Sequence, residues 1–330
     1  MNGEASTRQF TTPSYQDPST EESEQRRYIE LRLLHHWMVQ VSRPFGMTSP
    51  PEWKELWYGE VPQIALGHKN VLYAMFTMTA THLIGRGAID PALYQARENY
   101  WVWALREQRG AVTDLDNSNT DAVAFAALLI SVNALAMLQE RSLEPYSPPM
   151  DWLEVGRGAF TVLPPPEAVA EGSGLKILME NTASIWQMNP TLDSDMREEF
   201  GALLNRDAPS TDQWDDPETV EAYETALSYI YSFRRTILGG EPADINLRWI
   251  CMFPFMVTRK FVDFVGEGRP RALVTLAYFF AVVAHTDALQ YLGNSGDRTT
   301  PKREIYAIRR ILPEEWLSLM TWPLNEIATR

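Results

Sequence analysis

The sequence predicts an all-α protein: a single large helical domain of packed helices with an internal hydrophobic pocket. Apolar residues recur at three- and four-residue spacing between glycine and proline breaks, which is typical of amphipathic helices. No run of alternating β-branched residues lies between turn signals, so strands are not expected. The 330 residues are 45% hydrophobic and 22% charged, which allows a substantial core. The sequence has no repeat of fixed period, which argues against a regular helical solenoid.

The first residues differ from the rest of the chain. Residues 1–23 are polar and lack apolar periodicity, so we expect a disordered or loosely docked arm, followed by a helical domain over 24–330. The first helix is expected over 28–41, and Pro44 and Gly46 stop its pattern.

The N-terminal half shows several further helical patterns. Asp121 is the expected N-cap of an Ala-rich helix that is apolar all round and must therefore lie inside the fold. The helices expected here cover residues 51–58, 70–85, 91–110 and 121–138.

Prolines interrupt the middle of the chain. A helix over 151–163 is followed by Pro164, Pro165 and Pro166, and residues 167–174 are expected to form a mobile loop. A possible internal boundary therefore lies near 164–174.

The C-terminal half begins with a helix-start signal. Asp216 is the expected N-cap of a helix with Pro217 at its first position. Helices over 247–265 and 270–292, a polar loop over 293–302 and a terminal segment with Trp316 and Trp322 are then expected.

Charge and cysteine content restrict the partners. The chain has 29 Lys and Arg against 43 Asp and Glu, and a net charge of −14 opposes direct nucleic-acid binding. The single cysteine, Cys251, excludes an intrachain disulfide and a zinc site with several thiolates, and it fits a reducing cytoplasmic or nuclear environment. No secretory signal is recognised, and the apolar stretches 122–138 and 272–284 are shorter than the roughly 20 residues of a membrane span.

Familiar enzyme motifs are missing from the sequence. It contains no GxxxxGK[ST] loop, no GxSxG, no strand-associated GxGxxG and no HExxH, so we expect neither a metal nor a cofactor. Asp215, Asp216 and Glu218 resemble an aspartate-rich magnesium motif, but a capped helix start explains them better.

The aromatic and methionine content is high, with 11 Trp, 13 Tyr, 13 Phe and 13 Met. These residues gather on expected interior helices, as Met75 and Phe76 do. Such clusters usually form a core. They equally suit the walls of a cavity for a large apolar ligand, because methionine adapts its shape and aromatic rings are rigid. Both interpretations stay open.

Several blocks occur in an order that resembles one protein family. They are residues 33–37, 57–67 (WYGEVPQIALG), 71–83, 149–163 (PMDWLEVGRGAFTVL), 249–261 (WICMFPFMVTRKF), 272–285 (ALVTLAYFFAVVAH) and 311–323 with PEEW and TWP. Together they resemble the C-terminal regulatory domain of fungal sterol uptake control transcription factors, which are zinc-cluster regulators. The resemblance covers the chain from about Tyr28 to its end.

This resemblance implies an all-helical domain that holds a sterol-like ligand near its C-terminal helices and forms a homodimer. The matching positions give seven candidate ligand-binding residues: Met252, Phe255, Met256, Tyr278, Phe279, Val282 and Trp316. We add Met75 and Phe76 from the aromatic and methionine cluster. The chain departs from the family in two respects: it lacks the six cysteines of the DNA-binding zinc cluster, and residues 293–302 replace an aromatic-rich turn.

Two functions follow as hypotheses. The first is a stand-alone domain that binds a hydrophobic small molecule, such as a sterol, terpenoid or polyketide, without binding DNA itself. The alternative is a cofactor-independent cyclase or isomerase of fungal natural-product biosynthesis that uses the same pocket. Its acid and base candidates are His285, which we interpret as structural first, and Asp287, Tyr278 and Glu180.

Overall fold

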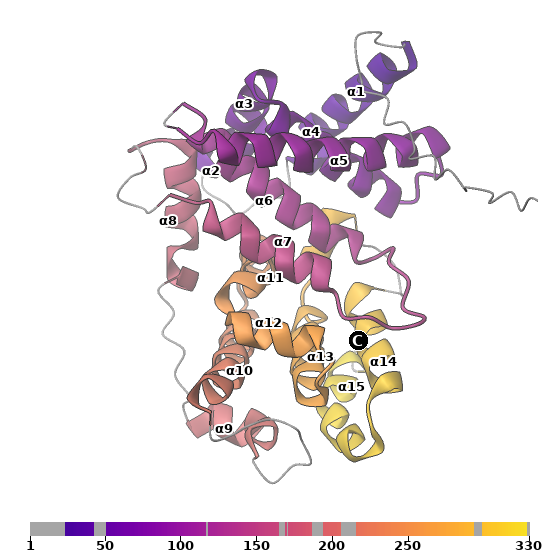
Figure 1. Cartoon of the computed structure of the whole chain (residues 1–330), viewed down its shortest axis with the longest axis vertical. Coiled ribbons are helices and arrows are strands. Elements are labelled where there is room, and N and C mark those ends of the chain that lie inside the picture. The colour runs from indigo at the N-terminus through magenta and orange to yellow at the C-terminus, as the bar shows by residue number, and fades with distance from the viewer. Residues whose placement is uncertain are drawn as a thin grey trace, which may run out of the picture.

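A computed structural model describes residues 24–42, 51–116, 118–164, 169, 171–186, 194–205, 216–293 and 299–328. These residues form helices and turns and include no β-strand, so the all-α prediction is confirmed. Figure 1 shows the helices packed into one domain, with the N-terminal helices at one end of the long axis and the C-terminal helices at the other.

The N-terminal helices pack around α4. This helix contacts α5 along most of its length and also packs against α1, α3 and α6. The elements of this region are α1 (Glu24–His36), the π-helical turn η1 (Trp37–Val41), α2 (Pro51–Glu55), the π-helical turn η3 (Leu56–Glu60), α3 (Val61–Gly67), α4 (Lys69–Gly85), α5 (Pro91–Thr113) and α6 (Thr120–Met137).

The remaining helices run from the middle of the molecule to its other end (Figure 1). In this half α13 is central, and it packs against α10, α12, α14 and α15. The elements are α7 (Met150–Thr161), α8 (Gly174–Trp186), α9 (Ser194–Phe200), η5 (Gly201–Leu204), α10 (Pro217–Leu238), α11 (Ala243–Met256), α12 (Arg259–Gly266), α13 (Pro270–Val283), η6 (Ala288–Leu292), α14 (Thr300–Ile311), η7 (Glu314–Met320) and α15 (Thr321–Ala328).

The helix α7 connects the two ends of the molecule. It contacts α6 on one side and α11 and α12 on the other. Gly156 makes this packing close, because a Cβ at this position would lie 2.8 Å from the Pro254 side chain of α11. The predicted arm over 1–23 lies outside the described residues, as does most of the predicted boundary before residue 171.

Some helix boundaries differ from those predicted. The expected helix over 247–265 is two helices, because Val257 is extended and Thr258 caps α12 by accepting a hydrogen bond from the Phe261 N–H. The expected helix over 270–292 ends at Val283, and a separate short helix begins at Ala288.

The cap predictions had mixed outcomes. The predicted cap at Asp216 is confirmed, since its carboxylate accepts from the Glu218 N–H at 3.2 Å. The predicted cap at Asp121 is wrong: Asn119 precedes α6, and Asp121 lies in its first turn. Burial there raises the pKa of the Asp121 carboxyl above its usual value.

The helix α6 is long and apolar enough to cross a membrane by length and composition alone. In this structure 78% of its residues are buried by neighbouring helices, as expected for the central helix of a domain.

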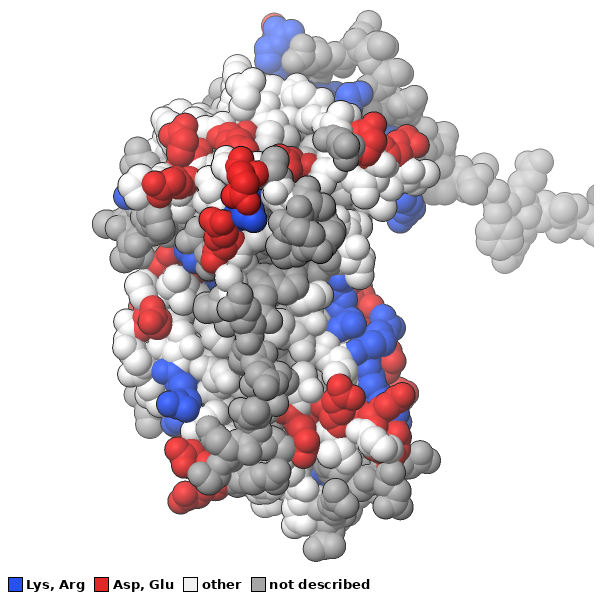
Figure 2. All heavy atoms as spheres, turned by 90° about the vertical axis from the view of Figure 1, so that its left-hand side faces the viewer, with Lys and Arg blue, Asp and Glu red and all other residues white. Residues whose placement is uncertain are grey.

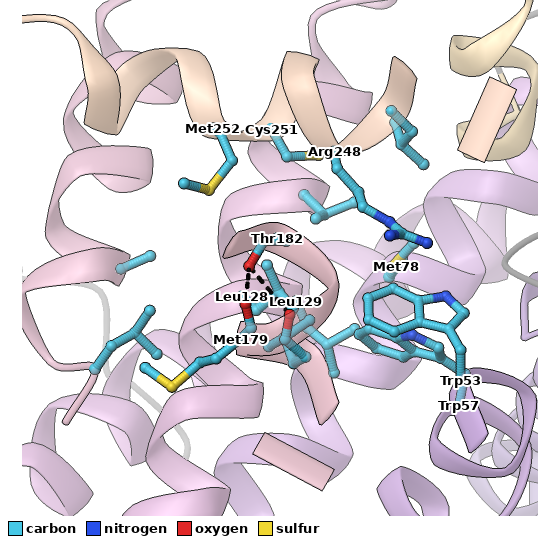
Figure 3. Close-up of a pocket in the computed structure, with 15 residues that line it drawn as sticks. Trp53, Trp57, Met78, Leu128, Leu129, Met179, Thr182, Arg248, Cys251 and Met252 are labelled. Carbon is cyan, nitrogen blue, oxygen red and sulfur yellow. Dashed lines mark hydrogen bonds between the residues drawn. The ribbon is translucent and has the colours of Figure 1, made fainter. Parts of the chain in front are cut away.

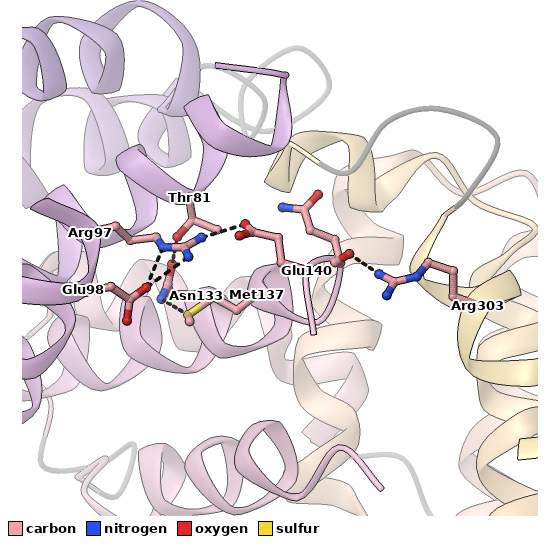
Figure 4. A network of polar contacts seen from close by, with 8 residues as sticks. Thr81, Arg97, Glu98, Asn133, Met137, Glu140 and Arg303 are labelled. Atoms are coloured by element: carbon pink, nitrogen blue, oxygen red, sulfur yellow. Dashed lines mark hydrogen bonds and ion pairs between the residues drawn. The ribbon is translucent and has the colours of Figure 1, made fainter. Parts of the chain in front are cut away.

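A polar network joins α6 and the chain after it to α5 and α14 (Figure 4). The Arg97 guanidinium donates to Glu140 at 2.7 Å and to Glu98 at 3.0 Å. Arg303 of α14 donates to the Gln139 carbonyl oxygen. Charged side chains therefore tie the N-terminal helices to the C-terminal end of the chain.

Candidate ligand cavity

An apolar cavity of about 70 Å³ lies between helices from both halves of the chain (Figure 3). Segments far apart in sequence contribute to it: α2, η3, α4, α6, α7, α8 and α11. Among the described residues, its lining consists of Trp53, Trp57, Met78, Leu128, Leu129, Val132, Ala159, Leu163, Leu178, Met179, Thr182, Leu247, Arg248, Cys251 and Met252.

One side of the cavity is aromatic and cationic. The rings of Trp53 and Trp57 meet edge to face with centroids 6.0 Å apart. The Arg248 guanidinium carbon lies 4.3 Å from the centre of the Trp53 ring, within cation–π distance. Arg248 also pairs with Asp244 one helical turn earlier, at 3.2 Å. Figure 3 shows Arg248 and the two indoles together, with Met179 and Met252 on the other side.

The polar atoms of the lining differ in whether they have hydrogen-bond partners. The Thr182 hydroxyl donates back to the carbonyl oxygens of Leu178 and Met179, at 3.0 and 3.1 Å. The Trp53 Nε1–H is buried, and no described residue accepts a hydrogen bond from it. A buried donor without an acceptor is unfavourable, but this atom has almost no surface that a ligand in the cavity could reach.

The two titratable groups of the lining are poorly suited to proton transfer. Burial raises the pKa of the Cys251 thiol to about 12, so the thiol is protonated at neutral pH. Burial lowers the pKa of the Arg248 guanidinium from its usual value, yet an arginine remains charged at neutral pH. The cavity therefore has the character of an apolar binding site.

The size of the cavity limits what it holds in this conformation. An engineered apolar cavity of ~150 Å³ binds benzene, and a space of about 70 Å³ is smaller. Three unbranched side chains, Met78, Met179 and Met252, form part of its wall. Methionine changes rotamer readily, so these walls can retreat at modest cost.

Of the predicted ligand-binding residues, the structure places Met252 in this lining and the others elsewhere. Phe279 is fully buried and stacks on Phe253 with ring centroids 3.9 Å apart. Tyr278 stacks on Trp322 at 4.6 Å. The other members are packed in or against the core: Met75, Phe76, Phe255, Met256, Val282 and Trp316. Their role in binding stays a prediction.

The predicted acid and base residues do not meet at the cavity. His285 follows α13, and its Nε2 lies 2.5 Å from a carboxylate oxygen of Glu326 on α15. Asp287 is exposed and accepts from Gln290. Burial, followed by the nearby charge of Glu199, raises the pKa of the Tyr278 hydroxyl to about 12. Glu180 is exposed on α8. Their catalytic role stays a prediction.

Most of the lining was missed at the sequence level. The segment that forms α8 carried a signal, since Leu175, Leu178, Met179 and Thr182 follow helical spacing. Trp53 and Trp57 fall in the predicted helix over 51–58, and the structure places both at the cavity. Arg248 gave no comparable signal, because only the fold brings it to Trp53.

A second, open hollow of about 940 Å³ lies between α5, the end of α6 and α7. Its surface mixes apolar side chains such as Trp101 and Met137 with the paired charges of Arg97 and Glu140. This hollow is larger than the apolar cavity but more polar and more exposed to solvent.

Comparisons with known proteins give a consistent result. A Zn(2)-C6 fungal-type transcription factor, afumD, from Aspergillus fumigatus is 28% identical over 287 residues, which cover 84% of this chain and 72% of that protein. A Zn(2)-C6 fungal-type transcription factor from Gibberella zeae is 24% identical over 96% of this chain and 65% of its own length. The chain is thus similar in sequence to fungal Zn(2)-C6 transcription factors over most of its length.

A sterol uptake control protein also matches. Sterol uptake control protein 2 of Saccharomyces cerevisiae is 28% identical over 141 residues, which are 41% of this chain and 15% of that protein. The resemblance inferred from the sequence blocks is therefore confirmed. These relatives extend well beyond the matched region, since the chain spans about two thirds of the Gibberella zeae homologue and much less of the yeast protein. No family model matches the chain.

Proposed function

We propose that this homologue of fungal transcription factors is a ligand-binding domain that takes up a hydrophobic small molecule between α4, α6, α7, α8 and α11. The observation that carries the proposal is the apolar cavity, with walls from both halves of the chain. Transfer of apolar surface from water into such a site contributes roughly 25 cal/mol per Å². A ligand there would bridge the two halves and stabilise their packing.

The ligand class is a sterol, terpenoid or polyketide. A sterol uptake control protein among the homologues supports the first of these. Typical ligand pockets have volumes of ~300–1,000 Å³, so a ligand of this size requires the walls of the 70 Å³ cavity to open. The methionines of α4, α8 and α11 are the side chains that we expect to move.

Binding of DNA is not part of the proposal for these 330 residues. They contain one cysteine, so a six-cysteine zinc cluster would have to lie outside them. Acidic side chains gather over the upper part of the face in Figure 2, where Lys and Arg form only small groups. We place the protein in the nucleus or cytoplasm, in line with its transcription-factor homologues, and we expect a homodimer, which light scattering tests.

The lining favours binding over turnover. Its described residues include no carboxylate and no histidine, and its single thiol is protonated. A cyclase acting here would depend on the shape of the cavity alone.

The test measures the binding of ergosterol, farnesol and emodin through the change in tryptophan fluorescence. After incubation, each compound is extracted into organic solvent and its mass is determined. Ala159→Phe fills the cavity, and Ala134→Phe is the matched control in the second hollow. We expect Ala159→Phe to weaken binding at least tenfold and Ala134→Phe to leave it within twofold. The reverse pattern would move the site to the second hollow. Absence of binding by all three compounds would refute the proposal, and recovery of altered compound would show turnover.

A further inference from the structure

The helix α8 forms an outer wall of the apolar cavity. Its residues Leu178, Met179 and Thr182 line the cavity. Another side of the helix faces solvent, where Glu180 is exposed. Figure 1 shows α8 at an outer edge of the molecule, and it packs against α2, α6 and α11. A displacement of α8 would therefore connect the cavity with solvent.

The lining is less buried near α8 than at the two indoles. Met179 of α8 and Leu163, which follows α7, are partly exposed, whereas Trp53 and Trp57 are 2% and 3% exposed. Figure 3 shows Met179 on the side of the cavity opposite the indoles. The helix α6, which also lines the cavity, has 78% of its residues buried by its neighbours. The side at α8 is therefore the one that opens with less disruption of the core.

A hydrogen bond fixes the start of α8 to the π-helical turn η3. The Gly174 N–H donates to Glu60 Oε1 at 3.0 Å. A carboxylate is favourable beside the first N–H groups of a helix. The approach is close, because a Cβ at Gly174 would lie 2.4 Å from the Leu56 side chain. This contact holds α8 against the same turn that carries Trp57.

Other polar contacts of α8 stay within its own segment. The ion pair of Lys176 with Glu171 is 3.1 Å long, and the Glu171 side chain is 85% exposed, so the pair contributes little. The Thr182 hydroxyl donates to carbonyl oxygens of α8 itself. Just before the helix, Gly172 has a φ of +76°, which glycine adopts without strain. The chain can therefore turn at Gly172 while α8 remains helical.

Building on the proposed function, we infer that α8 is the movable wall of the ligand entrance and that the cavity opens when the hydrogen bond between Gly174 and Glu60 breaks. In the open state, the apolar side of α8 leaves α2, α6 and α11, and a hydrophobic ligand enters behind it. Return of α8 covers the ligand. Such a movement explains how a cavity of about 70 Å³ admits a larger molecule without disrupting the helices of the core.

Cys251 reports the opening, because it lines the cavity on α11 and is the single cysteine of the chain. Burial raises the pKa of its thiol to about 12, so the thiol reacts slowly until water and reagent reach it. Mass spectrometry measures two rates on the full chain: modification of Cys251 by iodoacetamide, and amide hydrogen exchange in α8 and α6. We expect α8 to exchange at least tenfold faster than α6, because a local opening needs less free energy than global unfolding.

Variants at Glu60 test the contact that holds α8 closed. Glu60→Ala removes the acceptor and should raise both Cys251 modification and α8 exchange about tenfold, the effect expected for one hydrogen bond to a charged group. Glu60→Gln keeps an acceptor oxygen and should stay within about threefold of the wild-type rates. Glu55→Ala, which removes an exposed carboxylate at the end of α2, is the matched control and should change neither rate.

A variant far from α8 separates local opening from global unfolding. Ile305 of α14 is fully buried. Ile305→Val should lower overall stability and speed α6 exchange about fivefold. Because the contacts of α14 stay intact when α8 alone opens, Cys251 modification and α8 exchange should remain within twofold of wild type.

The outcomes are distinguishable. Cys251 modification that rises with α6 exchange in Ile305→Val would overturn the inference, because access would then need global unfolding. An unchanged rate in Glu60→Ala, or modification of the wild-type chain as fast as that of a free thiol, would also overturn it. Each of these results leaves the proposed function standing if ergosterol, farnesol or emodin binds. If α8 opens as expected and none of the three compounds binds, the proposed function fails, and with it the role of α8 as an entrance.

Discussion

The two ends of α7 border apolar regions that are packed in different ways. Near its start, Trp152 stacks on Phe253 and Phe279 with ring centroids 6.0 and 5.7 Å away. Two helical turns later, Ala159 borders the cavity of about 70 Å³. These three rings are nearly parallel and fully buried, so they pack closely between α7, α11 and α13. Side chains that converge on the cavity from seven separate elements do not interlock in this way.

The difference shows why aromatic content alone does not locate a binding site. The stacked rings of α11 and α13 came from the blocks richest in aromatic residues, and they form core. The cavity has leucine, methionine and a small Ala159 opposite two indoles. Rigid stacked rings support the fold, and adaptable side chains surround the space where a ligand is expected.

The largest expected effect comes from the stacked region. Phe279→Ala removes a fully buried ring that stacks on Phe253 at 3.9 Å. We expect the free energy of unfolding to fall by about 3–5 kcal/mol, because a large void remains in a closely packed core. Urea unfolding followed by circular dichroism measures it. A loss below about 1 kcal/mol, with ligand binding abolished, would instead make Phe279 a ligand contact, as the sequence analysis predicted.

A matched pair of glycines on α7 compares its buried side with its exposed side. An added Cβ at Gly156 would meet the Pro254 side chain at 2.8 Å, whereas nothing lies within 4 Å at Gly158. We expect Gly156→Ala to lower the free energy of unfolding by about 2 kcal/mol through overpacking. Gly158→Ala should raise it by about 0.5 kcal/mol, because alanine favours the helix. Thermal unfolding compares the two, and equal shifts would contradict the close approach of α7 and α11.

The sequence predicted the fold better than the site, for physical reasons. Helical periodicity and caps such as Asp216–Pro217 are local, so the helices were predicted largely in the right places. The break at Val257 and Thr258 was missed because the apolar pattern continues through it. The contact between Trp53 and Arg248 joins residues far apart in the chain. Such a contact depends on how helices pack, which periodicity does not specify.

Two histidines of the N-terminal region make the stability of the protein depend on pH. His36 Nε2 and His82 Nδ1 lie 2.9 Å apart, and burial, together with the charge of nearby Arg86, lowers the pKa of each histidine to about 4. The unfolded chain, with a histidine pKa near 6.5, therefore binds more protons than the native state between these values. The stabilisation is fully present above about pH 6.5 and is lost as the pH falls towards 4.

We expect His36 and His82 together to lower the free energy of unfolding by about 2 kcal/mol between pH 7 and pH 4.5. Two fully buried histidines would give a larger loss, but His36 is only partly buried. Urea unfolding at both pH values measures the loss. The double variant His36→Gln, His82→Gln should show a shallower dependence on pH, because glutamine does not titrate. Identical pH dependence in both proteins would contradict the assignment.

The last comparison adds the same volume to the cavity and to the closely packed core. Ala159 borders the cavity, and Ala277 of α13 is fully buried in the closely packed core. Ala277→Leu should lower the free energy of unfolding by about 1–3 kcal/mol, because a full core has no room. Ala159→Leu should change it by less than about 1 kcal/mol in either direction, since the added atoms enter empty space. Urea unfolding measures the free energy of unfolding of both variants. Equal losses would mean that the cavity accommodates added volume no better than the aromatic core.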